Sequence, residues 1–312
     1  MSLPKIYTDE NAGRRHLERL QWPDGPICPH CGVVDQATKL EGKSTRPGVY
    51  KCRACQRPFS VTVGTVFEDS HVPLHKWLYA AHLLTASKKG ISSHQLHRTL
   101  KVSYKTAWFM SHRIREAMRP AEFTPMGGAG KTVEVDETVT GKIEGAPARL
   151  RHGMGWGWGS WRNIALTLVE RGGSARSFHV SGTTLATLLP IIRANISRES
   201  HLMTDAAPYF KMVGKEFASH GRVEHGENEY VRYEGDRVIH TNTVEGYYSI
   251  FKRGMKGIYQ HCSEKHLHRY LSEYDFRYNY RVRLGYDDAM RADKALQGIR
   301  GKRLTYRRPH TA

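Results

Sequence analysis

The chain has 312 residues, and its 48 Lys and Arg against 30 Asp and Glu give a formal net charge of +18. Hydrophobic residues make up 39% and aromatic residues 10%, which suffices for folded cores and excludes a wholly disordered basic tail. The length suits about two domains. Because a folded protein this basic tends to bind a polyanion, nucleic acid is the first partner to expect.

No apolar run reaches the roughly 18 residues that a membrane-spanning helix needs. The best candidate, residues 77–86, is short and is interrupted by His82. The first ten residues include Asp9 and Glu10 and no apolar stretch, so a secretory signal is not expected. We therefore expect a cytoplasmic protein with no membrane partner, whose cysteines are ligands or buried thiols rather than disulfides.

Four cysteines form two pairs, Cys28-Pro-His-Cys31 and Cys52-Arg-Ala-Cys55, with 20 residues between them. Each short loop can present two thiolates, and two such loops complete the tetrahedral shell that Zn²⁺ prefers. Four thiolates leave no open coordination position, so the spacing predicts a structural zinc ion in a zinc ribbon over residues 1–67. His30 could replace one thiolate, and two unrelated pairs of buried thiols are the alternative.

Residues 68–123 have helical periodicity. Leu74, Trp77 and Leu78 begin one apolar stripe, and two further helices are expected at residues 92–100 and 104–118, joined by a tight turn. This pattern predicts a helix-turn-helix DNA-binding segment, with an ordinary helical hairpin as the alternative. The residues expected to contact DNA on the second helix are Lys105, Thr106, Arg113 and Arg115.

Residues 124–131, with one Pro and three Gly in the first seven, are expected to be a linker. The pattern then changes to alternation. Strands are expected at 133–138, 161–170, 176–180, 201–204 and 222–224, and helices at 183–196, 209–217 and from 243. This order predicts an α/β fold in which an RNase H-like catalytic domain, a mixed five-stranded sheet with helices, covers residues 132–260. Residues 261–312 are expected to form a C-terminal helix and a basic tail.

Three acidic residues fall on the elements that carry the active site of such a domain: Asp136 on the first strand, Asp205 after the fourth and Glu245 on the final helix. Phosphodiester cleavage with two Mg²⁺ ions needs carboxylates that hold the ions about 3.5–4 Å apart. Glu137 points to the opposite face of its strand from Asp136, so only one of the two can enter the site, and we expect Asp136. The alternative for Glu245 is a capping box in which Asn242 caps the helix.

The final helix carries a second signal. Glu245, Ser249 and Lys252 share one helix face, so Lys252 can hold a DNA phosphate beside the active centre. Gly246 on the same helix would let an opposing backbone approach closely.

Together these residues resemble the insertion-sequence transposases of the ISXO type, which join a zinc ribbon, a helix-turn-helix and a DDE catalytic domain. The matching stretches beyond the cysteines are Lys105–Arg115, Val135-Asp-Glu-Thr138, Thr204-Asp205 with Tyr209, His240-Thr-Asn-Thr-Val-Glu245, Phe251-Lys-Arg-Gly254 and residues 265–279. They cover most of the chain from about residue 20 to 280.

The resemblance implies a DNA transposase that recognises terminal inverted repeats and catalyses metal-dependent strand cleavage and strand transfer. Asp136, Asp205 and Glu245 would hold two Mg²⁺ ions, for which Mn²⁺ can substitute. Asn242 is a candidate contact because relatives vary at the third carboxylate, and Arg253 is an expected DNA contact in the same motif. The expected partners are double-stranded transposon ends and target DNA, bound by a homodimer or higher oligomer in a prokaryotic nucleoid.

The sequence departs from this family's pattern at residues 153–161, where Trp156 and Trp158 could stack on splayed bases or pack on a sheet edge. Two rival functions remain. One is a catalytically silent or domesticated zinc-ribbon regulator that binds DNA, and the other is a different RNase H-like nuclease, such as a junction resolvase.

Overall fold

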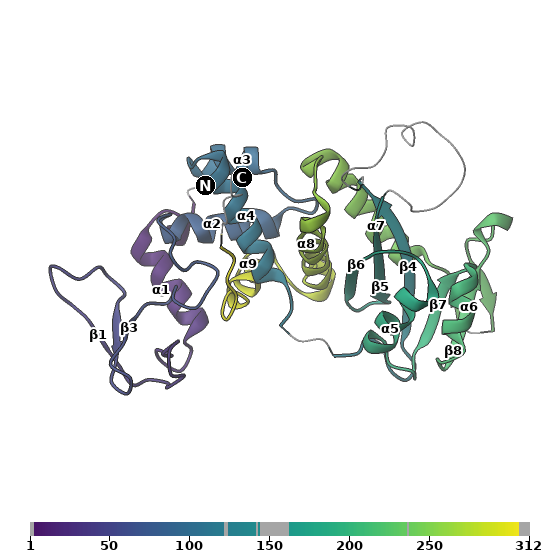
Figure 1. The fold of residues 1–312 in the computed structure, drawn as a ribbon, viewed down its shortest axis with the longest axis horizontal. Coiled ribbons are helices and arrows are strands. Elements are labelled where there is room, and N and C mark those ends of the chain that lie inside the picture. The colour runs from purple at the N-terminus through teal and green to yellow at the C-terminus, as the bar shows by residue number, and fades with distance from the viewer. Residues whose placement is uncertain (1–2, 122–123, 142, 144–161, 236, 306–312) are drawn as a thin grey trace, which may run out of the picture. The chain divides into compact units, whose positions relative to one another are not determined.

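The computed structural model describes residues 3–121, 124–141, 143, 162–235 and 237–305. Two compact units divide the chain: unit 1 contains Met1–Pro120 and Gly285–Ala312, and unit 2 contains Ala121–Leu284. The chain therefore enters unit 2 and returns to unit 1 (Figure 1), whereas the sequence analysis placed residues 261–312 in one C-terminal segment.

Unit 1 begins with α1 (Glu10–Gln21), a helix that the sequence analysis did not predict. Its N-cap is Asp9, whose side chain accepts a hydrogen bond of 2.6 Å from the Ala12 N–H. The ribbon that follows is a small antiparallel sheet in the order β1 (Ala37–Lys39), β2 (Tyr50–Cys52), β3 (Pro58–Phe59). Trp22 packs on Tyr50 of β2 and Phe59 of β3, and the three rings form much of the small apolar core of the ribbon.

Three helices continue unit 1, namely α2 (Leu74–Ala86), α3 (Ser93–Leu100) and α4 (Tyr104–Met118). Ser92 and Ser103 are the N-caps of α3 and α4, and each hydroxyl accepts a backbone N–H bond of 3.1 Å. Lys101 ends α3 in the left-handed region with φ 50°, which lets the chain reverse within three residues. The helix–turn–helix arrangement expected from the sequence is present.

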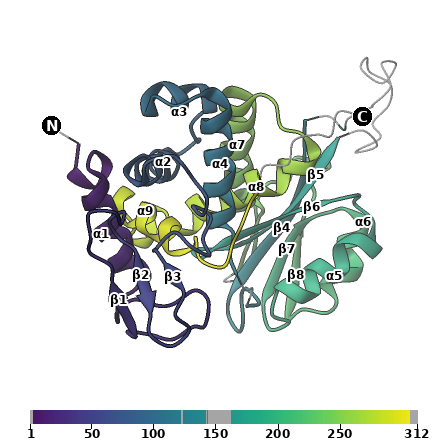
Figure 2. The same cartoon turned by 60° about the vertical axis from the view of Figure 1, so that its left-hand side comes forward.

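Unit 1 is completed by α9 (Asp288–Gln297), which packs on α2, α4 and α1 (Figure 2). Gln21 donates to the Leu296 carbonyl at 2.7 Å, and Val66 donates to the Ile299 carbonyl at 3.1 Å. Part of the expected basic tail is thus a packed helix, and Arg291 within it is buried.

Unit 2 is built on a five-stranded sheet with the order β6-β5-β4-β7-β8. Its strands are β4 (Thr132–Thr140), β5 (Asn163–Glu170), β6 (Ala175–Val180), β7 (His201–Asp205) and β8 (Ser219–Val223). The first three strands pair antiparallel, whereas β7 runs parallel to β4 and β8 parallel to β7. This mixed sheet, with its helices, confirms the predicted fold class.

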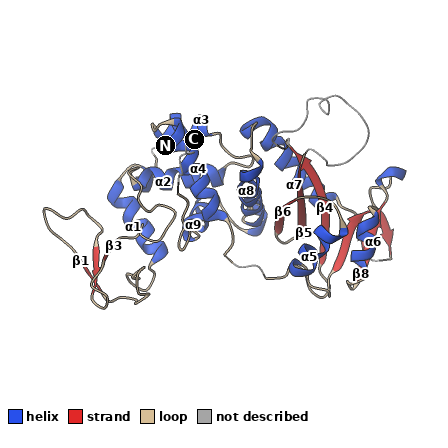
Figure 3. Cartoon of the chain, viewed as in Figure 1, coloured by secondary structure: helices blue, strands red, loops and turns tan. Residues whose placement is uncertain are grey.

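Helices cover both faces of the sheet (Figure 3). On one face, α5 (Leu185–Asn195) and α6 (Pro208–Gly214) pack on Val133 and Val135 of β4. On the other face, α7 (Asn242–Gly254) and α8 (Leu267–Asn279) pack on Ala165 and Val169 of β5. Since side chains alternate along β4, Glu134 and Asp136 point to the α7 face.

The connections of unit 2 hold further short elements. The expected linker is partly docked on this unit, because Met126 is buried in the core and Gly127 donates to the Glu170 carboxylate at 3.1 Å. A hairpin of β9 (Arg232–Glu234) and β10 (Arg237–Ile239) precedes α7, and one π-helical turn (Met255–Tyr259) follows it. In the ranges that the structure describes, every helix is too short or too polar to span a membrane.

Candidate active site and zinc site

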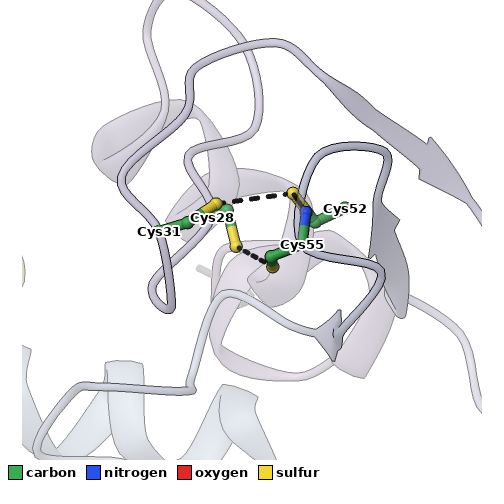
Figure 4. Close-up of side chains that lie close together, drawn as sticks. All are labelled: Cys28, Cys31, Cys52 and Cys55. Atoms are coloured by element: carbon green, nitrogen blue, oxygen red, sulfur yellow. Dashed lines mark hydrogen bonds between the residues drawn. The ribbon is translucent and has the colours of Figure 1, made fainter.

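The four predicted cysteines converge in unit 1. All four sulfur atoms lie within 4.8 Å of one another (Figure 4), with Cys28 Sγ 3.7 Å from Cys55 Sγ and Cys31 Sγ 3.6 Å from Cys52 Sγ. A tetrahedral ion with Zn–S bonds of about 2.3 Å requires sulfur–sulfur distances near 3.8 Å, so the donor set fits zinc.

The two loops that present these thiols have equivalent backbone geometry. Gly32 donates to the Cys28 carbonyl at 2.9 Å and Gln56 donates to the Cys52 carbonyl at 3.0 Å, and both donors have positive φ. The Cys55 N–H approaches Cys52 Sγ at 3.5 Å. His30 contacts the Pro58 carbonyl at 3.3 Å and is exposed, which supports the four cysteines as the ligand set.

Two of the predicted carboxylates come from neighbouring strands: Asp136 lies in the middle of β4, and Asp205 is the last residue of β7. The parallel register pairs Glu134 with Met203, and continuing it by two residues brings Asp136 toward Asp205, whose charge raises the pKa of Asp136. The Asp205 carboxylate accepts the Ala207 N–H at 3.0 Å, and Pro208 then starts α6. Asp136 and Asp205 thus point from the same sheet face.

The third carboxylate comes from the first turn of α7. Glu245 accepts a hydrogen bond of 2.8 Å from the Thr241 hydroxyl, and His225 Nε2 lies 3.4 Å from the same Glu245 oxygen. The Tyr248 hydroxyl of α7 donates to the Asp136 carbonyl at 2.7 Å, which joins the helix to β4 beside the site. The sequence alone does not indicate His225, because the placement of this residue depends on the fold of the segment between β8 and β9.

These carboxylates influence one another electrostatically. Burial raises the pKa of Asp136 well above its ordinary value, and the negative charges of Glu137, Asp205 and Glu245 raise it further. Burial also raises the pKa of Asp205. A cluster of acidic groups that disfavour one another's ionised forms is the electrostatic setting that a bound cation relieves.

Glu137 faces α6. Its carboxylate accepts a hydrogen bond from the Tyr209 hydroxyl, and burial raises its pKa to about 7. In the described ranges the four cysteines form the one group of potential metal ligands whose atoms all lie within 4.8 Å of one another, so the oxygens of Asp136, Asp205 and Glu245 are not all that close together.

The N-terminus of α7 differs from the capping-box alternative. The N-cap is Thr241, and Asn242 is the exposed first residue of the helix. The buried carboxylate of Glu134 accepts the N–H groups of Thr243 and Val244 at 2.8 and 2.9 Å. The sequence alone did not indicate Glu134, because its partners in α7, Thr243 and Val244, lie more than 100 residues away along the chain.

Lys252 and Arg253 lie on the exposed side of α7, and the Arg253 guanidinium folds back onto Ser249. A Cβ at Gly246 would meet open space among the described residues. The close approach of an opposing backbone that was expected at Gly246 is therefore not seen in this part of the chain.

Two predicted DNA contacts are corrected by their burial. Arg113 is 6% exposed and donates to the carbonyls of Leu304 and Glu68 at 3.0 Å each, and Arg115 is 1% exposed. Both arginines therefore stabilise the interior of unit 1 rather than present charge at its surface. Lys105 is exposed, whereas the Thr106 hydroxyl contacts Ser103 at 2.8 Å. Trp156 and Trp158 lie outside the described residues.

Comparison with known proteins agrees with this architecture. Residues 127–279, which contain Asp136, Asp205 and Glu245, match the ISXO2-like transposase domain. Residues 8–58, which contain the four cysteines, match the transposase zinc-ribbon domain. The chain belongs to the ISXO2-like transposase family. The family model starts at residue 127, so the docked segment around Gly127 is part of the matched domain of this transposase.

The transposase is also similar to a Halobacterium salinarum protein named "Uncharacterized protein in transposable element ISH50". The two are 27% identical over 283 residues, which cover 88% of this chain and 92% of the relative. The similarity extends over both units.

Proposed function

We propose that this transposase recognises the terminal inverted repeats of its element and catalyses cleavage and strand transfer with two Mg²⁺ ions held by Asp136, Asp205 and Glu245. The observation that carries the proposal is the placement of these three carboxylates. Two come from the adjacent parallel strands β4 and β7 and the third from α7, close enough for Asp205 and Glu245 to raise the pKa of Asp136.

When bound, such ions activate the attacking oxygen and stabilise the leaving oxygen of a phosphodiester. The chain's own residues set the conditions for this chemistry. Asp136 and Asp205 are fixed by strand register, and the Thr241 hydroxyl orients Glu245. Lys252 lies two turns along the exposed side of α7, where its ammonium can attract a DNA phosphate.

For end recognition, we propose that the start of α4 approaches the duplex. Lys101 and Lys105 are exposed around the turn between α3 and α4, and Arg98 is exposed at the end of α3. A second helix whose N-terminal turn reads the major groove is the usual geometry of a helix-turn-helix. We propose that a homodimer or higher oligomer brings two ends together.

The experiment uses zinc-loaded full-length protein and a supercoiled plasmid that carries the gene with its flanking DNA. We expect nicking in Mg²⁺ or Mn²⁺, and a loss of about 10³-fold or more in Asp136→Asn and Asp205→Asn, with DNA binding retained. Glu216→Gln is the matched control, because Glu216 pairs with Arg193 and Arg198 away from the carboxylate cluster.

Wild-type nicking rates in Asp136→Asn or Asp205→Asn would show that the catalytic assignment is wrong. A wild-type protein that shifts the plasmid's end fragments but never nicks them would favour the regulator instead. Joining of the cut end to a second duplex separates a transposase from a resolvase, which cuts without joining.

A further inference from the structure

We propose that Glu134 is a positioning residue that anchors the N-terminus of α7 and thereby sets where Glu245 stands relative to Asp136. This inference rests on the proposed function for the significance of Glu245 and Asp136. The anchoring itself rests on the contacts of Glu134.

The Glu134 side chain has no exposed surface and accepts hydrogen bonds from three residues. Arg171 Nε donates at 2.6 Å, the Thr243 hydroxyl at 2.7 Å, and the N–H groups of Thr243 and Val244 at 2.8 and 2.9 Å. A buried carboxylate with this set of donors is rigidly held, because each bond to an ionised oxygen is stronger than a neutral one.

These contacts replace the ordinary cap of α7. The first four N–H groups of a helix lack partners inside it, and a side chain at the N-cap usually accepts one or two of them. The Thr241 side chain makes no such bond, since its hydroxyl donates to Glu245. The Glu134 carboxylate on strand β4 therefore takes the place of an N-cap side chain.

Arg171 extends the same anchor to the segment before α7. Its terminal nitrogens donate to the carbonyls of Val238 and His240 at 2.7 and 2.9 Å, while its Nε holds Glu134. One ion pair, with Glu134 buried and Arg171 half-buried, thus secures both the chain that leads into α7 and the first turn of the helix.

Strand β4 positions two of the proposed metal ligands: it carries Asp136, and through Glu134 it holds the helix that carries Glu245. Glu134 and Asp136 are two residues apart on the same face of β4, so Asp136 is carried by the strand that holds the helix. Val244, whose N–H the carboxylate binds, directly precedes Glu245. If the first turn frays, Glu245 is the ligand that moves.

The experiment compares Glu134→Gln with Glu170→Gln in zinc-loaded full-length protein. Glu134→Gln keeps the side-chain shape but puts an N–H₂ group where donors converge. Glu170 is the matched control, because it lies beside Glu134 in the β4–β5 pair and also accepts a backbone N–H, while its partners Gly127 and Lys131 both lie outside α7.

Three readouts are taken: hydrogen–deuterium exchange of peptides from α7 and β5, Mn²⁺ binding by calorimetry, and plasmid nicking. For Glu134→Gln we expect exchange at Thr243 and Val244 to rise about 10-fold or more and Mn²⁺ affinity and nicking kcat to fall about 10–100-fold, with KM for DNA unchanged. Glu170→Gln should match the wild type in all three.

Unchanged α7 exchange and Mn²⁺ affinity in Glu134→Gln would overturn the proposal, as would a rise in β5 exchange equal to that in α7, which marks general destabilisation. If Glu134→Gln does not fold, Thr243→Val decides, because it removes one bond to the carboxylate and should change the same readouts in the same direction. If Asp205→Asn binds Mn²⁺ and nicks like the wild type, the proposed function fails, and α7 exchange alone then decides the anchoring.

Discussion

Asp275 of α8 gives a prediction that tests how unit 2 is held together. Its carboxylate is buried and accepts hydrogen bonds from the Ser177 N–H and hydroxyl, both at 2.7 Å, and from the Tyr247 hydroxyl at 2.6 Å. It therefore joins β6, α7 and α8. Replacing it with Asn keeps the shape but brings an N–H₂ donor toward other donors.

The pKa of Asp275 sets the magnitude. Burial raises it from 3.8 to about 6, against the lowering effect of the hydrogen bonds from Tyr247 and Ser177. Between these two values the folded state holds a proton that the unfolded state has released, so stability from this group rises as pH falls through 6. The gain between pH 7 and pH 5 is about 1 kcal/mol.

We expect Asp275→Asn to lower the free energy of unfolding of unit 2 by about 1–3 kcal/mol at pH 5. The deficit should shrink by about 1 kcal/mol at pH 7, because only the wild type loses its proton-linked stability. Ser177→Ala removes a donor that lowers the Asp275 pKa, so the pH range over which the stability of this variant changes should shift to higher pH.

Urea titration with pulse proteolysis, followed through β5 peptides by mass spectrometry, reports the unfolding of unit 2. If the free energy of unfolding of unit 2 varies with pH in the same way in the wild type and in Asp275→Asn between pH 5 and pH 8, burial in this network does not raise the pKa of Asp275, and the reasoning is refuted.

Three further outcomes are expected. Arg113→Ala should lower the stability of unit 1 by about 2–3 kcal/mol, while Lys105→Ala leaves it unchanged and weakens DNA binding in a gel shift; the reverse pattern would contradict the buried and exposed placements. Gly246→Ala should raise the stability of unit 2 by about 0.5–1 kcal/mol in urea, because a Cβ there meets open space in the described residues and Ala favours a helix; a loss would indicate an unseen contact. Cys52→Ser should abolish bound zinc by elemental analysis and change Trp22 fluorescence, with the far-UV circular dichroism of the sheet retained; unchanged zinc content would refute the four-thiolate site.

Local patterns predicted much of this fold. The spacing of the four cysteines and the alternation around Asp136 are properties of a few neighbouring residues, and Pro208 marks where β7 ends. The helix α1 could also have been predicted, because Asp9 is a standard N-cap and the buried residues Gly13, Leu17 and Gln21 are spaced four apart.

Contacts between distant segments could not be predicted in the same way. Arg113 looked like a surface charge because its partner Leu304 lies 191 residues further along the chain. The capping-box alternative for α7 involved only neighbouring residues, whereas Glu134 reaches the start of the helix across 109 residues. Periodicity indicates that a helix has a buried side, but it does not identify what covers that side.

The return of the chain to unit 1 has a consequence for synthesis. Helix α9 covers α2 and binds Gln21 through the Leu296 carbonyl, yet it is translated only after all of unit 2. A product that stops at Pro120 lacks this cover and leaves apolar side chains of α2 exposed to water. Under the proposed function, we therefore expect a chain that ends at Pro120 to bind transposon ends more weakly than the full-length protein, because its unit 1 is incomplete.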